Sequence, residues 1–238
     1  MQRHLNWLGQ LIMYPDVKKN SLKIICFGYR EWSKNIYRSL SDNQKLENHQ
    51  FILINNKKLV DYDFCNSLKP DMILFYGWSE IIDHEIIENF CCLMLHPSSL
   101  PQYRGGSPIQ NQIIDGIKES EVCIFKMEKE IDSGQIIKRA KLDLTGDLKE
   151  IFKRIELIGT KLSLQFLING FNPQPQIGNP TYCNRRKPEE SEITKEEINE
   201  CSALYLHNKI RMLNDPYPNA FIKCSDGKKL YITKSYIE

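Results

Sequence analysis

The fold is indicated by a short apolar run, Leu22-Lys-Ile-Ile-Cys-Phe-Gly28, which ends at a glycine. Such a run is typical of a buried strand, and apolar residues at helical spacing follow it. Three similar runs come later, at Phe51–Ile54, Asp71–Tyr76 and Cys92–Leu95. The stretch Ser79–Asn89, between the last two runs, has helical spacing. Strands that alternate with helices in this way predict an α/β protein with a mostly parallel, three-layer sheet.

The pattern continues after the fourth strand. Ser107-Pro-Ile-Gln110 predicts a helix start, with the serine as cap, the proline in the first turn and Gln110 completing a capping box. Two further strands are predicted over Glu121–Met127 and Gly134–Leu144. Asp147-x-x-Glu150 then opens a long helix, because apolar residues three and four positions apart follow it.

The composition of the chain changes at residues 172–180, where prolines and a glycine form a connector. An amphipathic helix is predicted over Glu196–Leu213, followed by a turn at Asp215–Pro218 and two closing strands. We therefore divide the chain into an extension (1–20) forming an extra helix or flap, a main domain (21–171) and a small α+β subdomain (172–238).

The composition limits the classes of function. The chain has 238 residues, and 32 Lys and Arg against 30 Asp and Glu give a net charge of +2, so no general field for nucleic acid is expected. The eight cysteines have no CxxC spacing and the five histidines are isolated, so neither a disulfide framework nor a metal site is expected. We find no membrane span and no signal peptide in the sequence, and we expect a cytoplasmic protein.

Chemistry is expected at the carboxyl ends of the strands, where ligands bind in open α/β sheets. No GxGxxG follows the first strand, which argues against a nicotinamide or flavin enzyme. His96 follows the fourth strand and Asp132 lies in another strand-end loop. A carboxylate facing an imidazole suits proton transfer. The alternative is that His96 caps a strand and Asp132 makes a turn with Gly134.

Two further segments are candidate ligand sites. Arg104-Gly-Gly-Ser107 runs into a helix N-terminus, an arrangement that favours an anion such as phosphate. The alternative is a flexible turn before a capped helix. Tyr76 and Trp78 are placed to enclose a flat heterocycle, although aromatic residues after a strand are more often part of the core.

Two motifs together resemble those of a known family. The stretch Leu93-Met-Leu-His-Pro-Ser-Ser-Leu-Pro-Gln-Tyr-Arg-Gly-Gly-Ser-Pro-Ile109, followed by Ile131-Asp-Ser-Gly-Gln-Ile-Ile137, is similar to the signature of folate-dependent formyltransferases. The resemblance covers about residues 22–171 and implies a Rossmann-like formyltransferase fold. Two C-terminal segments, Tyr182–Pro188 and Asn208–Phe221, resemble the branch that acts on nucleotide-linked amino sugars.

The resemblance implies an N-formyltransferase that uses 10-formyltetrahydrofolate, without a metal. The implied acceptor is a nucleotide-linked amino sugar, most specifically dTDP-4-amino-4,6-dideoxyglucose for O-antigen or other surface glycans. His96 and Asp132 are the implied catalytic residues. The implied folate contacts are Tyr76, Gly77, Trp78, Ile81, Met127, Ile131 and Asp132. The implied sugar-nucleotide contacts are Pro97, Tyr103, Arg104, Gly105, Gly106, Ser107, Tyr182, Arg185, Arg211 and Tyr217.

The resemblance leaves two alternatives open. The first is a methionyl-tRNA formyltransferase, which we disfavour because only about 60 residues follow the connector and the charge is near neutral. The second is a non-catalytic folate or nucleotide-sugar binder. It is motivated by Met94, which stands where the family has an asparagine that donates a hydrogen bond to the formyl oxygen. Losing such a donor costs about 10²–10³ in rate, unless Asn111 or a backbone amide compensates. The family also implies a homodimer.

Overall fold

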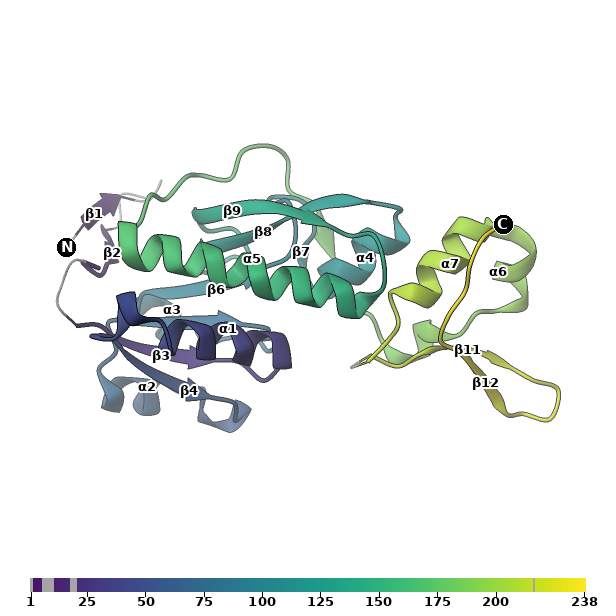
Figure 1. Ribbon diagram of the computed structural model, residues 1–238, viewed down its shortest axis with the longest axis horizontal. Helices are drawn as coiled ribbons and strands as arrows, with labels where there is room; N and C mark the ends of the chain where they lie inside the picture. Colours follow the sequence, from purple (N-terminus) through teal and green to yellow (C-terminus); the bar gives the residue numbers. More distant parts are fainter. Residues whose placement is uncertain (1, 6–10, 18–20, 216) are drawn as a thin grey trace.

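A six-stranded sheet forms the centre of the protein in the computed structural model, which describes residues 2–5, 11–17, 21–215 and 217–238 (Figure 1). The strand order is β4-β3-β5-β6-β8-β9. The first four strands of this order are parallel, and β8 runs antiparallel to both of its neighbours, β6 and β9. The predicted α/β class with a mostly parallel sheet is therefore confirmed. The strands are β3 (Lys23–Phe27), β4 (Gln50–Ile54), β5 (Met72–Tyr76), β6 (Cys92–His96), β8 (Glu119–Lys126) and β9 (Ile136–Asp143).

Helices cover both faces of the sheet, which explains why its inner strands are apolar at nearly every position. On one face α1 (Glu31–Ser41) packs against α5 (Leu148–Asn169), and α5 also contacts β8 and β9 (Figure 1). On the other face lie α2 (Tyr62–Leu68) and α3 (His84–Asn89). The predicted start of the long helix is confirmed, and Asp147 and Glu150 form a capping box there by exchanging side-chain to backbone hydrogen bonds.

The helical spacing after the first strand is confirmed by α1, whereas other helix predictions need correction. The sequence did not indicate α2, and α3 begins at His84 rather than Ser79. The single helix expected over 196–213 is two helices, α6 (Lys195–Glu200) and α7 (Ala203–Arg211), because the backbone is extended at Cys201 and Ser202 caps the second helix. Ser202 is a strong N-cap residue, and the apolar pattern running across it hid the break.

The helix start at Ser107 also differs from the prediction. The helix α4 (Pro108–Ile114) begins with proline as expected. However, Ser107 has left-handed backbone (φ 53°), so its hydroxyl does not cap the helix and instead accepts a hydrogen bond from the backbone N–H of Arg186. Gln110 completes no capping box, and its buried Nε2 has no hydrogen-bond partner among the described residues.

The N-terminal segment forms a hairpin where it is described, with β1 (Gln2–Leu5) antiparallel to β2 (Leu11–Tyr14). Of the expected helix or flap, a helix is therefore wrong for these residues, and residues 1, 6–10 and 18–20 lie outside the described part. Tyr14 stacks on Phe171 with ring centroids 5.0 Å apart, and Val17 is buried in the same core. The end of the segment thus contributes to the core of the main domain.

The C-terminal part extends from one end of the main domain (Figure 1). It contains α6, α7 and a two-stranded sheet of β11 (Ala220–Lys223) and β12 (Lys229–Ile232). The two predicted closing strands are therefore confirmed. Ile210, Met212 and Leu213 belong to the main hydrophobic core, so the subdomain shares that core. Before it, β10 (Tyr182–Cys183) pairs in parallel with β7 (Arg104–Gly105). None of the described helices is long and apolar enough to cross a membrane.

Candidate active site

His96 is the last residue of β6, at the carboxyl edge of the sheet. Its side chain is 6% exposed and lies edge-on to Phe125, with ring centroids 6.4 Å apart. Nε2 lies 2.8 Å from the carbonyl oxygen of Tyr103. Because that oxygen can only accept, Nε2 carries the proton in this contact. The ring orientation is thus fixed by a short loop that follows the strand.

Asp132 comes from the turn between β8 and β9, where its backbone is left-handed (φ 50°). Its Oδ2 lies 3.5 Å from His96 Nδ1 and accepts a hydrogen bond of 2.8 Å from the backbone N–H of Gly105. Left-handed non-glycine residues cluster at functional sites because the surrounding contacts must hold them there. The two residues singled out from separate loops are therefore brought together.

The pair is suited to moving a proton. Both ring nitrogens of His96 face oxygen acceptors, and only an imidazolium can donate to both. With Nε2 held by the Tyr103 carbonyl oxygen, Nδ1 is the ring nitrogen that faces Asp132. The carboxylate of Asp132 is 10% exposed, so its interaction with the ring is only weakly screened by water.

The predicted folate residues fall on two faces of the sheet. Trp78 packs on Phe27 and Phe75 in the core cluster that also contains Met127. Tyr76 faces the opposite cluster, where it stacks on Tyr37 and hydrogen-bonds to Ser163. Tyr76 directly follows Phe75 on β5, and successive strand residues point to opposite faces of the sheet. The assignment of Tyr76 as a folate contact is therefore corrected.

The cluster around Trp78 has features of a ligand site. The Trp78 indole Nε1 is buried and has no hydrogen-bond partner among the described residues. Two large apolar side chains near this edge are exposed, Ile81 to 93% and Ile131 to 59%. Exposed apolar groups beside a buried unpaired donor fit a flat, partly polar ligand. Gly77 has φ 62° and turns the chain between Tyr76 and Trp78.

Met94 lies two residues before His96 on β6, so its side chain is on the same face of the sheet. It is half-buried and packs against the Trp78 cluster. A thioether donates no hydrogen bond, so this position supplies no donor to a formyl oxygen. Asn111, proposed as compensation, donates instead to the carbonyl oxygens of Gly106, Ser107 and Asn184.

Arg104 does not present its guanidinium to an open anion site. The residue is 7% exposed, and its donors bond to Gln176 Oε1 and to the Tyr182 hydroxyl. Gln176 in turn donates to the carbonyl oxygens of Asp132 and Gly134, each at 2.8 Å. No sequence pattern pointed to Gln176, which lies in the irregular connector. Together these bonds link the connector to the turn that carries Asp132.

The two glycines after Arg104 also have a different role from the predicted one. A Cβ on Gly105 would lie 2.5 Å from the Cys183 carbonyl oxygen, and one on Gly106 would lie 2.6 Å from Arg185 Cα. The glycines therefore admit residues 181–186, hereafter the crossing segment, rather than a ligand. Pro97 contributes its carbonyl oxygen to Gln112 Nε2.

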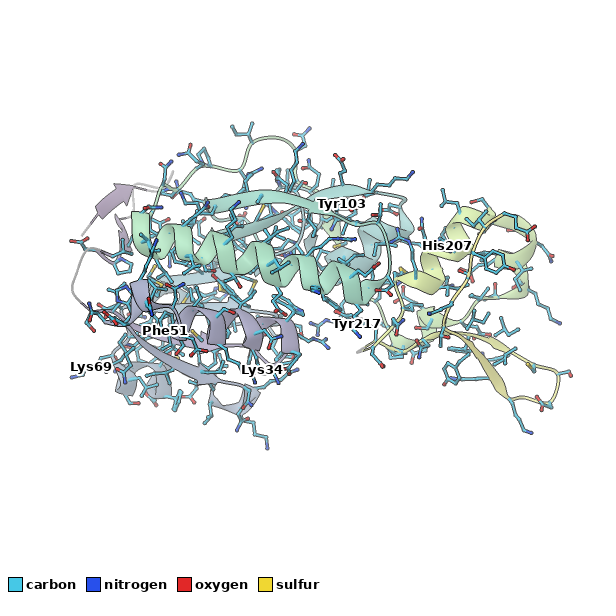
Figure 2. All side chains as sticks on the ribbon, in the orientation of Figure 1. Lys34, Phe51, Lys69, Tyr103, His207 and Tyr217 are labelled. Atoms are coloured by element: carbon cyan, nitrogen blue, oxygen red, sulfur yellow. The ribbon has the colours of Figure 1, made fainter. Side chains whose placement is uncertain are left out.

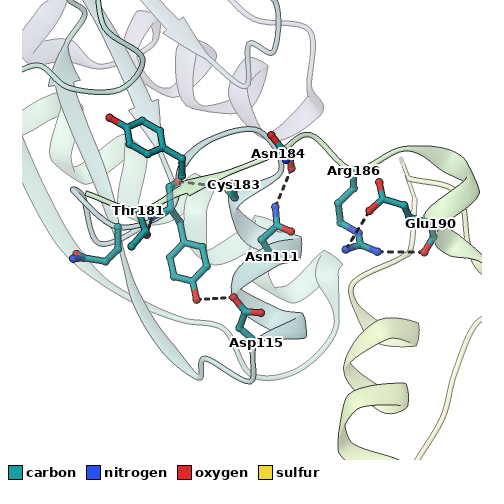
Figure 3. A pocket seen from close by; sticks show the side chains of 10 residues that line it. Asn111, Asp115, Thr181, Cys183, Asn184, Arg186 and Glu190 are labelled. Atoms are coloured by element: carbon teal, nitrogen blue, oxygen red, sulfur yellow. Dashed lines mark hydrogen bonds and ion pairs between the residues drawn. The ribbon is translucent and has the colours of Figure 1, made fainter. Parts of the chain in front are cut away.

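A cavity of about 600 Å³ lies beside the crossing segment (Figure 3). Tyr103 donates its hydroxyl hydrogen to Asp115 there, and burial together with that carboxylate raises the pKa of Tyr103 to about 12. Arg186 pairs with Glu190 on the other side of Asn111 (Figure 3). The cavity is lined by Gln102, Tyr103, Asn111, Asp115, Thr181, Tyr182, Cys183, Asn184, Arg186 and Glu190.

The remaining predicted acceptor contacts are spread apart. Tyr182 is exposed and Arg185 reaches the Ser79 carbonyl oxygen, so both remain near the strand ends. Arg211 instead donates to the carbonyl oxygens of Leu144 and Gly146, which ties the subdomain to the main domain and removes it from the diphosphate assignment. No group of metal-binding side chains occurs among the described residues.

Comparisons with known proteins agree with this geometry. The family described as Formyl transferase matches residues 24–162. Methionyl-tRNA formyltransferase from Campylobacter lari is 34% identical over 176 residues, which cover 70% of this chain and 58% of that protein. The chain spans 55–64% of the length of the first curated relatives that it matches.

Solved structures extend the comparison. Methionyl-tRNA formyltransferase from Clostridium thermocellum has a TM-score of 0.79 and 34% identity, covering 89% of this chain and 97% of that chain. A 4-N formyltransferase from Francisella tularensis has a TM-score of 0.73 and 17% identity, covering 91% and 98%, and shows the fold. On this evidence the chain belongs to the formyl transferase family.

Proposed function

We propose that the chain transfers a formyl group from 10-formyltetrahydrofolate to the amine of a nucleotide-linked amino sugar, the most specific candidate being dTDP-4-amino-4,6-dideoxyglucose. The observation that carries formyl transfer is the His96–Asp132 pair, fixed between the Tyr103 carbonyl oxygen and the Gly105 N–H. The pair lies at the end of β6, on the same face as the Trp78 cluster. A proton-transfer pair beside an apolar, partly exposed surface is what acyl transfer between two bound substrates requires.

Trp78, Ile81, Met127 and Ile131 are the residues that would hold the folate. Trp78 offers a buried indole N–H that has no protein partner among the described residues, and the two isoleucines offer exposed apolar surface. When bound, 10-formyltetrahydrofolate supplies an activated formyl carbon. The residues present therefore suit a flat aromatic group with polar edges.

The chemical step exchanges one C–N bond for another. The acceptor amine nitrogen bonds to the formyl carbon, the bond from that carbon to the folate nitrogen breaks, and one proton passes from the amine to the leaving nitrogen. His96 takes and returns this proton at Nδ1, while Asp132 stabilises the imidazolium. Gly105 fixes the carboxylate through its backbone N–H, so the pair needs little rearrangement during the step.

A second candidate acceptor is methionyl-tRNA. It is favoured by the relatives from Campylobacter lari and Clostridium thermocellum, both named for that activity and both 34% identical. Chain length points both ways, because the chain covers 97% of the Clostridium structure but only 58% of the Campylobacter protein. A third candidate is binding without transfer, favoured by Met94.

One experiment distinguishes the three candidates. The purified chain is incubated with 10-formyltetrahydrofolate and, in parallel, with dTDP-linked 3-amino and 4-amino deoxysugars or with charged methionyl-tRNA. A formamido sugar in the wild type, absent in His96→Asn, supports the proposal. Formyl-methionyl-tRNA formed faster than any formamido sugar supports the second candidate. Folate or sugar binding without either product supports the third.

A further inference from the structure

We propose that Arg30 binds the phosphate groups of the acceptor, a role that the predicted residues Arg104 and Arg211 do not fill. This inference rests on the proposed function, because it names a subsite for the same acceptor. Arg30 directly precedes α1, at the carboxyl end of β3. The strand order reverses between β3 and β5, which are neighbours although β4 comes between them in the chain. Ligands of open α/β sheets bind at this switch point.

Arg30 is held in place by aromatic rings. Its guanidinium carbon lies 5.2 Å from the ring centroid of Tyr29 and 5.2 Å from that of Tyr217. Its aliphatic stem packs over the turn at Gly77, where an added Cβ would lie 3.0 Å from Arg30 Cβ. Tyr217 is itself stacked on Phe152, and it lies at the junction between the main domain and the C-terminal part (Figure 2). Contacts to rings position a guanidinium without using its N–H donors.

The donors of Arg30 are therefore available for a ligand. Every other arginine side chain that the structure describes donates to a protein acceptor. Arg30 makes no side-chain hydrogen bond or ion pair with any described residue. A planar guanidinium with five unused donors is the group that proteins use for bidentate phosphate binding.

The surrounding charges favour an anion. Lys57 lies 4.4 Å from the Tyr29 ring centroid, and Arg185 reaches the neighbouring Ser79. Two carboxylates of this region are paired with cations: Glu31 with Lys34 and Arg38, and Glu80 with Lys57. The local balance is thus positive, although the whole chain carries only +2.

The position suits the acceptor rather than the folate. Only β5 separates β3 from β6, so the usual strand spacing places the end of β3 about 10 Å from His96. A sugar diphosphate spans such a distance between its reacting amine and its charged groups. The ligand chemistry at Arg30 is therefore a phosphate or diphosphate.

The test uses inorganic pyrophosphate as the probe, with binding measured by titration calorimetry on the full chain. Arg30→Gln should weaken pyrophosphate binding at least about tenfold, since hydrogen bonds to charged groups are strong. Arg139→Gln is the matched control, because it removes the same charge from an exposed pair with Glu121 and should leave binding unchanged. Tyr217→Phe should retain binding, whereas Tyr217→Leu should weaken it several-fold. Equal binding by Arg30→Gln and Arg139→Gln, or no binding by the wild type, overturns the proposal.

Parallel titrations with inorganic phosphate, dTDP and a dTDP-sugar identify the source of the phosphate, and tighter Arg30-dependent binding of dTDP supports a nucleotide diphosphate. The outcomes also separate this proposal from the proposed function. Arg30-dependent binding without any formyl product would leave the subsite standing and remove the enzymatic role. Formyl product with an unchanged acceptor KM and pyrophosphate Kd in Arg30→Gln would do the reverse.

Discussion

His96 and Asp132, 36 positions apart in the sequence, meet with Nδ1 and Oδ2 separated by 3.5 Å, and the same carboxylate oxygen accepts the Gly105 N–H. The backbone of the Arg104–Gly105 strand thus fixes one member of the pair, while the Tyr103 carbonyl fixes the other. The loop Pro97–Ser107 therefore holds both members of the pair.

Asp132→Asn should lower the formyl-transfer rate by about 10²–10⁴-fold, because an amide cannot stabilise the imidazolium that forms on His96. The amide still accepts the Gly105 N–H, so the fold should survive. Steady-state kinetics and a thermal melt check the two expectations separately. Wild-type turnover in a folded Asp132→Asn protein would contradict the assigned role.

Met94→Asn should raise kcat by about 10²–10³-fold, since it places an amide donor two residues before His96 on the same face of β6. Met94→Leu is the matched control and should leave the rate unchanged, because neither side chain donates. The comparison uses kcat at saturating acceptor. An unchanged rate in Met94→Asn would mean that another group already supplies the donor.

Gly105→Ala should detach the crossing segment, because its Cβ would lie 2.5 Å from the Cys183 carbonyl oxygen. Gly116→Ala provides the control: both glycines have positive φ, 99° and 77°, but no atom lies within 4 Å of a Cβ at Gly116. The control should therefore lose only about 1 kcal/mol from backbone strain. Limited proteolysis of the connector should be accelerated in Gly105→Ala alone; equal protection in both variants would argue against the clash.

The ion pair between Glu197 and Lys209 should make stability depend on pH. Burial alone would raise the pKa of Glu197, but hydrogen bonds and charge from Lys209 lower it below its usual value. A carboxyl group with a lowered pKa stabilises the fold above its unfolded-state pKa, near 4.3, and this contribution is lost as the pH falls through the folded-state value. Urea unfolding of wild type should show this loss below about pH 4.

Glu197→Gln should remove that pH dependence and cost about 3 kcal/mol at pH 7, because it leaves the buried Lys209 without its carboxylate. Lys223→Gln, which breaks a more exposed pair with Glu192, should cost less than about 1 kcal/mol. Similar costs for the two variants would show that the buried pair contributes nothing special.

The regular part of the fold could be predicted because it depends on local patterns. Apolar runs marked the parallel strands, and Asp147 with Glu150 marked the start of α5. The break at Ser202 was missed because the apolar spacing continues across it. The helix α2 was missed because its seven residues are too few to show a helical pattern.

The candidate site was predictable only in part. His96 and Asp132 carry a chemical signature, and strand ends converge on one edge of a parallel sheet. The roles of Arg104 and its two glycines depend on the crossing segment, about 80 residues away in the sequence. Local spacing therefore indicated a bound ligand at a place that the crossing segment itself occupies. Gln176 and Arg30 owe their positions to tertiary contacts alone. The expected homodimer stays a prediction.

The most direct test of formyl transfer at His96 uses donor labelled with ¹³C in the formyl group. Wild type and His96→Asn are incubated with labelled 10-formyltetrahydrofolate and the dTDP-amino sugar panel, and the products are followed by carbon NMR. We expect a labelled formamide carbon with the wild type and none with His96→Asn. Absence of labelled formamide with the wild type, or equal labelling by the two proteins, would contradict it.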